Sequence, residues 1–351
     1  MRFVHDSRAQ RVVFARAAAL PAILEEAGAM GSRIMLIASR REDALAAGIA
    51  ASLEVVHHHT EVVRHVPLAL AERAREAAVS ARAEVLVSVG GGSATGLAKA
   101  VALTSRLPIL AVPTTYAGSE ATDVWGLTAG DAKTTGADPV VLPRTVVYDA
   151  TLLAGLPAEL AVASGLNALA HGIDAMWGPR ADPIDRALAA EGIRAVAAGL
   201  PGIAGAGSAV ADIEQTLYGG YLAAVAFASA GSGMHHKICH VLGGMFDLPH
   251  APTHAVVLPH VLGFNAPAAA EAEQRIAQAL GAATAVAGLA TLCRSVRAPV
   301  ALRDLGMPED GIRRAIPPIL DAIPASNPAP VTPDNLAALL RAAWEGAPCD
   351  H

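Results

Sequence analysis

The sequence predicts an α/β N-terminal domain with a parallel sheet, followed by an all-α C-terminal domain. Short apolar segments alternate with helical patterns up to residue 112, which is typical of a parallel sheet covered on both faces. After Thr151 the strand signal disappears, and Gly and Pro interrupt long helical patterns. We therefore place the domain boundary at residue 152.

The elements follow from hydrophobic patterning along the chain. An Ala-rich helix is expected to end near residue 27, and another helix to span residues 66–82. Between residues 124 and 148, Gly, Thr and Pro interrupt short strands, which predicts an irregular hairpin or loop excursion. The expected parallel strands are residues 11–14, 33–37, 52–57, 84–89 and 107–112, and the expected C-terminal helices lie within 156–230 and 267–346.

Composition excludes several classes of protein. The 351 residues include 26 Lys+Arg and 32 Asp+Glu, a net charge of −6, so no basic excess indicates nucleic acid or an anionic membrane as a partner. With 53% hydrophobic and 17% charged residues, disorder is excluded as the main state.

Cysteine content and the N-terminal residues indicate a cytoplasmic protein. Cys239, Cys293 and Cys349 form an odd, sparse set, which favours a reducing compartment. The segment MRFVHDSRAQR shows no signal peptide. Two uncharged runs, 217–234 and 277–293, are rich in Ala, Gly, Ser and Thr, and we expect buried helices rather than membrane spans.

A glycine-rich turn follows the strand expected at residues 84–89. Gly90, Gly91 and Gly92 precede Ser93, which opens a helix. Glycines allow a diphosphate to approach the backbone, and the free N–H groups of a helix start bind anions. The spacing of Gly90, Gly92 and Gly96 is one residue off the usual dinucleotide fingerprint, so a simple strand-to-helix turn remains the alternative.

Hydroxyl side chains follow the strand expected at 107–112. The segment PTTYAGSEAT offers Thr114, Thr115, Tyr116 and Ser119. A polar loop with caps is the alternative. Since ligands bind beyond the carboxyl ends of parallel strands, this loop and the glycine-rich turn together favour a dinucleotide.

The third candidate for cofactor binding is Ser39. Dinucleotide folds often hold the ribose 2′-hydroxyl with a carboxylate after the second strand. Here Ser39, Arg40 and Arg41 stand at that point, and Glu42 is the nearest carboxylate. Ser39 and Arg40 would tolerate or prefer a 2′-phosphate; alternatively, the two arginines are ordinary solvated charges.

Histidines form the most specific feature. Asn167 and His171 are four residues apart and share one helix face, as do His236 and His240. His250 follows a proline in an expected loop. In all, six histidines lie within residues 235–260. We expect His260 to be structural, and His57–His59 with His65 to lie on a strand or edge.

These motifs resemble a known superfamily. GGGSATGLAKA, PTTYAGSE, the Asn167–His171 helix and HHKICHVLGGMFDLPH resemble the iron-containing alcohol dehydrogenases, which have a dehydroquinate-synthase-like fold. YAGSEATDVWGLT, KTTGADPVVLPRTVVYD, SGLNALAHGID and HAPTHAVVLPH resemble, more narrowly, the maleylacetate reductase family. The resemblance covers essentially the whole chain.

The resemblance implies the domain roles and the reaction. Residues 1–152 would bind the nucleotide, residues 153–351 would form the helical substrate and catalytic domain, and the active site would lie in the cleft between them. The reaction would be NADH- or NADPH-dependent reduction of the conjugated C=C bond of maleylacetate to 3-oxoadipate, in bacterial degradation of aromatic compounds. The family habit is a homodimer acting on a small dicarboxylate, with no nucleic-acid or membrane partner.

The same resemblance bears on metal binding. Metal-dependent relatives hold iron or zinc with an Asp and three His, and the matching positions are Asn167, His171, His236 and His250. An amide replaces the carboxylate, and the substrate is a dianion, so we expect no metal requirement, although three histidines could hold zinc. Imidazoles and Lys237 would then supply the electrostatic stabilisation.

The expected mechanism assigns roles to these residues. Hydride transfer to the alkene carbon leaves an enolate, which His236 and His250 would stabilise, with His171 and His240 completing or orienting the set. A histidine would then protonate the α carbon. Lys237, Thr114, Thr115 and Tyr116 would hold carboxylates or position the nicotinamide.

Three alternatives remain at this point. A metal-dependent alcohol dehydrogenase of the same superfamily would need added zinc or iron. A dehydroquinate-synthase-like lyase would show no net cofactor oxidation. A protein that binds nucleotide without turnover would keep the fold alone.

Overall fold

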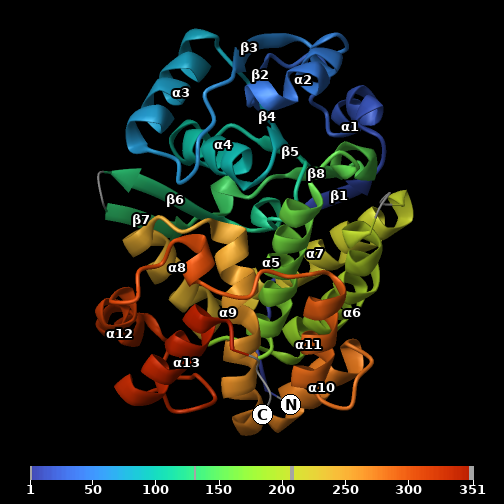
Figure 1. The fold of residues 1–351 in the computed structure, drawn as a ribbon. Helices are drawn as coiled ribbons and strands as arrows, with labels where there is room; N and C mark the ends of the chain where they lie inside the picture. The colour runs from blue at the N-terminus through green and yellow to red at the C-terminus, as the bar shows by residue number, and fades with distance from the viewer. Residues whose placement is uncertain (1, 130–131, 206–208, 348–351) are drawn as a thin grey trace. The chain divides into compact units, whose positions relative to one another are not determined.

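The computed structural model describes residues 2–129, 132–205 and 209–347, so the expectation about Cys349 lies outside the described residues. The chain divides into two compact units (Figure 1). Ser7–Gly155 forms the first, called here the α/β unit. Met1–Asp6 with Leu156–His351 forms the second, called here the helical unit.

A six-stranded parallel sheet organises the α/β unit. Its order is β1-β8-β5-β4-β2-β3, and every neighbouring pair is parallel. The strands are β1 (Arg11–Phe14), β2 (Ile34–Ala38), β3 (Val55–His59), β4 (Val85–Gly90), β5 (Ile109–Pro113) and β8 (Thr145–Tyr148). The predicted fold class is thereby confirmed.

Helices cover both faces of this sheet, as parallel connections require. On one face, α1 (Leu20–Glu26) and α2 (Asp43–Ala50) pack on a buried cluster that includes Leu36, Val87 and Val112. On the other, α3 (Leu68–Ser80) and α4 (Gly92–Ser105) pack on a cluster that includes Met35, Ile37 and Leu86. Alternate residues of β2 thus serve opposite faces.

The sequence expectation missed one strand. The β8 segment, TVVY, lies between β1 and β5 in the sheet and is fully buried. It fell within the segment expected to form short strands of an irregular hairpin or loop excursion, because the Gly, Thr and Pro residues before it hid its place in the parallel sheet. The antiparallel hairpin of β6 (Val124–Ala129) and β7 (Ala132–Ala137) accounts for the rest of that segment.

The third strand lies later in the chain than expected. It was expected at 52–57 and runs instead from Val55 to His59, since three polar histidines masked its end. His57, His58 and His59 therefore lie on β3, the terminal strand of the sheet order. His65 lies outside the strand, in a left-handed conformation with φ of 62°.

The helical unit contains nine α-helices among its described residues. They are α5 (Ala158–Ala175), α6 (Pro183–Ala204), α7 (Val210–Ala230), α8 (Met234–Phe246), α9 (His250–Asn265), α10 (Ala270–Ala279), α11 (Ala285–Ser295), α12 (Gly311–Ala322) and α13 (Pro333–Glu345). Helices α8, α9, α12 and α13 share a buried core that includes Ile238, Val257, Ile319 and Leu340.

Small residues bring α5, α6 and α7 close together. A Cβ on Gly192 would lie 2.9 Å from the backbone of Ala223 on α7, and one on Gly219 would lie 2.7 Å from Gly192. Side chains larger than hydrogen would separate the helices there. Close packing of this kind lets an aromatic-poor sequence build a dense core.

The uncharged runs considered for membrane spanning behave differently from one another. Residues 217–234 belong mostly to α7, whereas 277–293 is not one helix, because a turn separates α10 from α11. By length and composition alone, one helix of the described chain, α6, could cross a membrane, and 44% of its apolar window is buried. Since α6 packs against α5 and α7, one such helix is weak evidence for a membrane span.

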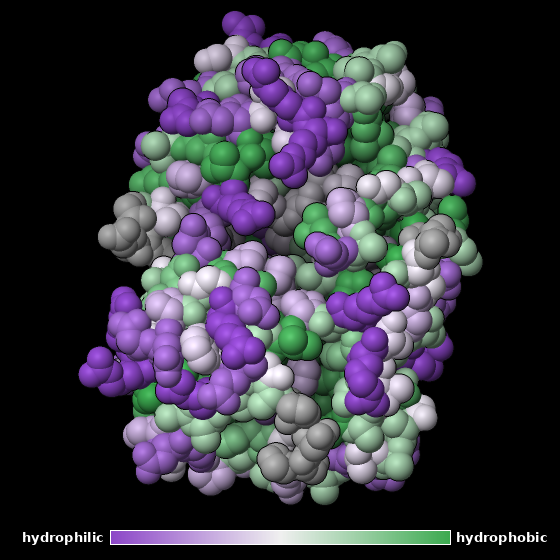
Figure 2. Space-filling view, in the orientation of Figure 1, coloured by the Kyte–Doolittle hydropathy of each residue, from purple (hydrophilic) through white to green (hydrophobic). Residues whose placement is uncertain are grey.

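The surface shown in Figure 2 mixes hydrophobic and hydrophilic residues. Large exposed hydrophobic side chains occur far apart in the sequence, such as Val79, Leu160 and Val300. Single exposed apolar residues are common in soluble proteins.

Candidate active site

The three predicted cofactor loops follow three neighbouring strands of the α/β unit. Strand β4 lies between β5 and β2, and in its register Ala38 pairs with Val89 and Gly90 with Pro113. The Thr114 N–H donates to the Gly90 carbonyl at 3.1 Å. The structure therefore brings Ser39, the glycine-rich turn and the Thr114 loop to one edge of the sheet.

The glycine-rich turn leaves a free helix start. Gly90 has φ of 142°, which strongly favours glycine, and Gly91 is the N-cap of α4 without a side-chain cap. A Cβ on Gly91 would lie 3.0 Å from the Thr115 side chain, so the two loops touch. Ser93 is half-buried in the first turn of α4. Uncapped N–H groups at a helix start suit a diphosphate.

The hydroxyl loop offers fewer accessible groups than expected. Thr114, Thr115 and Ser119 are half-buried. Tyr116 is only 2% exposed, and burial raises the pKa of its hydroxyl. Tyr116 is thus placed as a packed side chain, which its position in a polar segment did not indicate.

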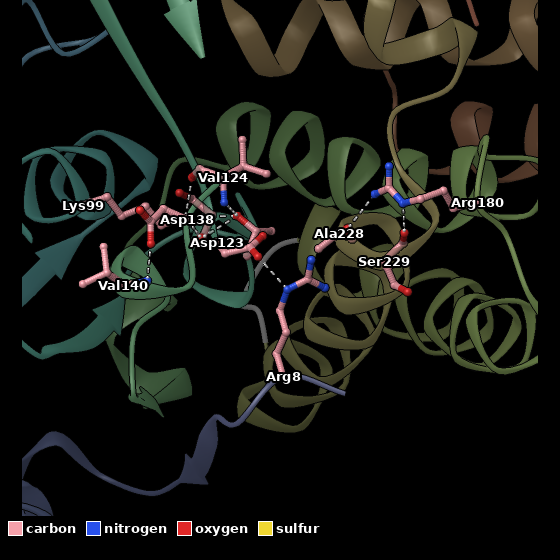
Figure 3. Close-up of polar contacts among 11 residues, drawn as sticks. Arg8, Lys99, Asp123, Val124, Asp138, Val140, Arg180, Ala228 and Ser229 are labelled. Carbon is pink, nitrogen blue, oxygen red and sulfur yellow. Dashed lines mark hydrogen bonds and ion pairs between the residues drawn. The ribbon is translucent and has the colours of Figure 1, made fainter. Parts of the chain in front are cut away.

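A buried lysine fixes the far end of this loop (Figure 3). Lys99, on α4, donates through Nζ to the Ser119 carbonyl at 2.6 Å, the Val124 carbonyl at 2.8 Å and Thr122 Oγ1 at 3.0 Å. Burial lowers the pKa of Lys99 to about 7, although Glu120 and Asp123 partly oppose this effect. All three ammonium hydrogens have acceptors, so the lysine stabilises the loop.

The end of β2 carries a small capping network. Ser39 Oγ donates to the Glu42 carboxylate and accepts the Arg41 N–H at 3.3 Å. Ser39 thereby holds Glu42, four residues after the last residue of β2, close to the end of that strand.

In the helical unit, the predicted imidazoles gather on three helices. Asn167 and His171 lie on α5, His236 and His240 on α8, and His250 begins α9. The ring centroids are 4.9 Å apart for His171–His236, 6.1 Å for His236–His240 and 6.3 Å for His240–His250. These four histidines form a continuous row, called here the imidazole cluster together with His235 and His254.

His235 and His254 were missed as site residues. The His254 ring lies 4.7 Å from that of His236 and 4.3 Å from that of His250. The expectation that His250 lies in a loop is wrong: it is the first residue of α9, so His254 stands one turn later on the same helix. Because His250 and His254 are four residues apart, their spacing could have revealed this pair.

Exposure falls from one end of the cluster to the other. His240 and His250 are exposed, whereas His171, His235, His236 and His254 are buried. Burial lowers the pKa of His171 to about 3 and that of His235 to about 4. Burial, reinforced by neighbouring imidazoles, also holds the pKa of His236 and His254 well below 6.5. The buried rings are therefore neutral near pH 7.

Several buried polar atoms of this cluster and of Asn167 have no hydrogen-bond partner among the described residues. They are Asn167 Oδ1, His171 Nδ1, His236 Nε2 and both ring nitrogens of His254. Leaving such atoms unpaired costs roughly 1–3 kcal/mol each, so buried polar groups in native proteins are paired with protein, ordered water or a ligand. The cluster therefore suits a polar ligand.

A carboxylate that sequence reasoning missed lies beside His236. Asp174, on α5, is fully buried, and its Oδ2 lies 2.9 Å from His236 Nδ1 and accepts the Gly233 N–H at 2.9 Å. Burial raises the pKa of Asp174 to about 6, partly opposed by these hydrogen bonds. An acidic residue three positions after His171, in an apolar helix, was the available signal.

The end of α7, which precedes α8, is held by Arg180. Arg180 Nε donates to the Ser229 carbonyl at 3.1 Å (Figure 3). The Arg180 N–H donates to the Ala230 carbonyl at 2.8 Å. Lys237 follows His236 on α8 and is half-buried. Among the described residues, no hydrogen bond joins the Lys237 side chain to the imidazole cluster.

The residues were tested against the metal that the superfamily implies. Among the described residues, three groups of possible ligands have their atoms within 4.8 Å of one another: Asp174–His235–His236, His235–Cys239–His254 and His5–Asp182–Asp185. The set His171, His236 and His250 is not among them. Within the first group, Asp174 and His236 hydrogen-bond each other. With Asn167 in place of a carboxylate, the matching positions fit a divalent metal poorly.

Comparisons with known proteins cover both units. A family model described as iron-containing alcohol dehydrogenase matches residues 9–150. A second, described as the C-terminal part of the Fe-containing alcohol dehydrogenase family, matches residues 161–344.

Individual relatives match along the whole chain. A maleylacetate reductase of Sphingobium indicum is 42% identical over 350 residues, covering 99% of each chain. An iron-containing alcohol dehydrogenase structure from Corynebacterium glutamicum has 54% identity and a TM-score of 0.97, covering 99% of this chain and 98% of that one. A maleylacetate reductase structure from Agrobacterium tumefaciens has 36% identity and a TM-score of 0.93, covering 99% of each chain.

Proposed function

Because the chain belongs to the iron-containing alcohol dehydrogenase family, we propose that it reduces maleylacetate to 3-oxoadipate with NADH or NADPH. The curated relatives, at 38–45% identity, are maleylacetate reductases. The observation that carries the proposal within the chain is the imidazole cluster, where buried polar atoms lack partners and an amide replaces a ligand carboxylate. Because the amide carries no charge, the site is less negative than one with the ligand carboxylate, which makes it better suited to a dianion.

The reaction balances as follows. When bound, the nicotinamide supplies a hydride, with its electron pair, to the alkene carbon β to the ketone. The C=C electrons move toward the ketone, whose oxygen becomes an enolate. The α carbon then takes one proton, so that maleylacetate, NAD(P)H and a proton give 3-oxoadipate and NAD(P)⁺.

The imidazoles stabilise the enolate and supply the proton. His250 and His236 are the candidates for direct contact, with His171 and His240 completing the set. A bound dianion raises the pKa of the rings around it, and a ring that takes up a proton has two N–H donors. Preorganised donors of this kind stabilise a developing oxyanion without solvent reorganisation. Lys237 contributes positive charge toward a substrate carboxylate.

The cofactor is held by the α/β unit. The start of α4 takes the diphosphate, and Gly91 permits close approach. Thr114, Thr115 and Ser119 supply hydroxyls near the nicotinamide side. At the adenosine side, Ser39 holds Glu42 at the end of β2, which favours ribose hydroxyls over a 2′-phosphate. The earlier expectation, that Ser39 and Arg40 tolerate a 2′-phosphate, gives the opposite preference.

The first experiment measures loss of nicotinamide absorbance with fresh maleylacetate. Parallel assays use NADH and NADPH, each with and without EDTA. Rapid oxidation that EDTA does not change supports the proposal and the metal-independent site. No oxidation of either cofactor contradicts the proposal, and faster oxidation of NADPH contradicts the role given to Glu42.

A metal-dependent alcohol dehydrogenase is the second candidate. It is favoured by the 54% identity to a structure described as an iron-containing alcohol dehydrogenase. Activity on an alcohol that appears only after zinc or iron is added would support it. Asn167 is the feature of this chain that speaks against it.

The proposal includes the substrate class, the cellular location and the oligomeric state. The substrate is a small dicarboxylate, the location is the bacterial cytoplasm, and the active form is a homodimer. Light scattering coupled to size-exclusion chromatography measures the mass directly, and the mass of a single chain would contradict the dimer.

A further inference from the structure

We infer that Asp174 is a positioning residue that fixes the tautomer of His236, leaving Nε2 as the bare ring nitrogen that is available to the substrate. The substrate itself rests on the proposed function, whereas the tautomer rests on contacts within the helical unit. Both residues belong to that unit, on α5 and α8.

The contacts of Asp174 Oδ2 determine what His236 must donate. This oxygen accepts the Gly233 N–H at 2.9 Å and the His236 N–H at 3.3 Å, so it serves as an acceptor toward α8. His236 Nδ1 lies 2.9 Å from the same oxygen. A carboxylate has no hydrogen to donate, so Nδ1 of His236 carries the proton.

The neighbouring histidine is consistent with this assignment. His235 Nε2 lies 3.1 Å from the His254 carbonyl, which can only accept, so His235 carries its proton on Nε2. Its Nδ1 is therefore a lone pair, and it faces His236 Nδ1 at 3.3 Å. A proton on His236 Nδ1 satisfies both neighbours, whereas a bare Nδ1 would face two acceptors.

The consequence falls on Nε2 of His236. In the neutral ring this nitrogen is a bare lone pair, and it is buried without a hydrogen-bond partner among the described residues. Nε2 is therefore the ring atom through which His236 would act in the proton transfer of the proposed function. The proton itself is the one that the overall reaction consumes, so it is taken up from solvent in each turnover.

The residues around His236 hold its ring in place. A Cβ at Gly233 would overlap the Asp174 carboxyl group, so only glycine lets α8 begin against it. The His171 ring stacks on His236 at 4.9 Å, and Phe227 lies 4.2 Å from it, so the ring is held on its faces as well. Together, the Asp174 carboxylate, Gly233 and the packed rings restrict the His236 imidazole to one orientation.

Asp174 also caps α8, and the test must separate the two roles. We would compare Asp174→Ala in the wild-type background with the same change in a His236→Gln background. If Asp174 acts through His236, kcat should fall at least about 100-fold in the first background and less than about 3-fold in the second. A purely structural role predicts the same fractional loss in both, which would overturn the inference.

Two further variants control for side effects. Asp174→Asn keeps an oxygen in the place of Oδ2, so it should retain the tautomer and recover part of the lost kcat. Trp177→Phe removes the 3.4 Å contact to Asp174 Oδ1 and leaves Oδ2 in place, so kcat should stay within about 3-fold of wild type. A fall with Trp177→Phe as large as with Asp174→Ala would assign the effect to local packing instead.

The tautomer can also be measured without substrate or variants of Asp174. NMR of ring-¹⁵N-labelled histidine in the full-length protein, with His236 assigned by its loss in His236→Gln, should show Nδ1 protonated and Nε2 bare. A proton on Nε2 of the neutral ring would overturn the inference. If maleylacetate is not reduced yet Nδ1 is protonated, the proposed function fails and the positioning of His236 stands.

Discussion

Lys99 in the α/β unit and the imidazole cluster in the helical unit are both buried and ionisable, but they differ in how their hydrogen bonds are completed. The Lys99 ammonium finds three acceptors from one loop. The cluster leaves Nε2 of His236 and both nitrogens of His254 without partners in the described structure. A completed buried network stabilises the fold, whereas an incomplete one keeps capacity for a ligand.

The largest expected effect is on turnover. His236→Ala should lower kcat by roughly 10²–10⁴-fold, because it removes a group that exchanges a proton with the substrate. Cofactor affinity should change little, since the cofactor loops lie in the α/β unit. Steady-state kinetics with maleylacetate and nicotinamide cofactor measure both.

The exposed His58 provides the control for this variant. His58→Ala should leave kcat unchanged. Unchanged turnover in His236→Ala would remove His236 from the mechanism.

The next effect is on stability. Lys99→Met should reduce the free energy of unfolding by about 3 kcal/mol, because three buried acceptors lose their donor. Urea unfolding followed by circular dichroism measures this. Lys237→Met, at a half-buried lysine, serves as the comparison and should shift the midpoint far less. Equal shifts in the two variants would show that Lys99 is not a special stabilising contact.

A third effect separates cofactor binding from chemistry. Gly91→Val should raise the KM for the nicotinamide cofactor at least about 10-fold, since the new side chain meets Thr115 and blocks the diphosphate approach. Turnover at saturating cofactor should be largely kept. Gly155→Ala, where no atom lies within 4 Å of the added Cβ, is the matched control. A fall in kcat without a change in KM would contradict this division of labour.

The smallest effect is on pH dependence. The pKa of His171 is about 3 in the folded chain against 6.5 for an ordinary histidine, and His235 and His260 lie near 4. A lowered histidine pKa means that the unfolded chain binds more protons, so stability falls as pH drops from 6.5 toward 4.

Asp174, with a raised pKa, acts in the opposite direction, because its folded form binds more protons between pH 3.8 and about 6. Burial also raises the pKa of Glu120 and of Asp185, so these two groups act in the same direction as Asp174. The buried histidines with a lowered pKa outnumber these three carboxyl groups, so the net effect is acid destabilisation. Between pH 6.5 and 5, one such histidine contributes at most about 2 kcal/mol. Thermal melts across this range should show a falling Tm, and a Tm that rises on acidification would contradict the neutral state of the cluster.

Local spacing predicted which of the candidate residues lie near one another. Gly90–Gly92 and Thr114–Thr115 follow strands whose apolar runs were visible, and neighbouring parallel strands place such loops together. The spacing of four between Asn167 and His171, and between His236 and His240, put each pair on one helix face. What was predicted depended on contacts between near neighbours in sequence.

The unpredicted features depend on contacts between distant segments. The link between Asp174 and His236 joins residues 62 positions apart. The acidic residue in an apolar helix was visible in the sequence, but its partner was not. Burial of Tyr116 and the central place of β8 in the sheet likewise arise from packing against other elements. Sequence spacing does not predict the burial or hydrogen bonding of a side chain when its tertiary partner determines them.

The contact between Trp177 and Asp174 has an optical consequence. The chain has only three tryptophans, and Trp177 places its indole N–H 3.4 Å from the Asp174 carboxylate. Indole emission responds to nearby charge, so Trp177 fluorescence becomes a built-in reporter of the charge on Asp174. In a protein in which Trp125 and Trp344 are replaced by Phe, the emission would follow the carboxylate beside His236 in real time as ligands bind.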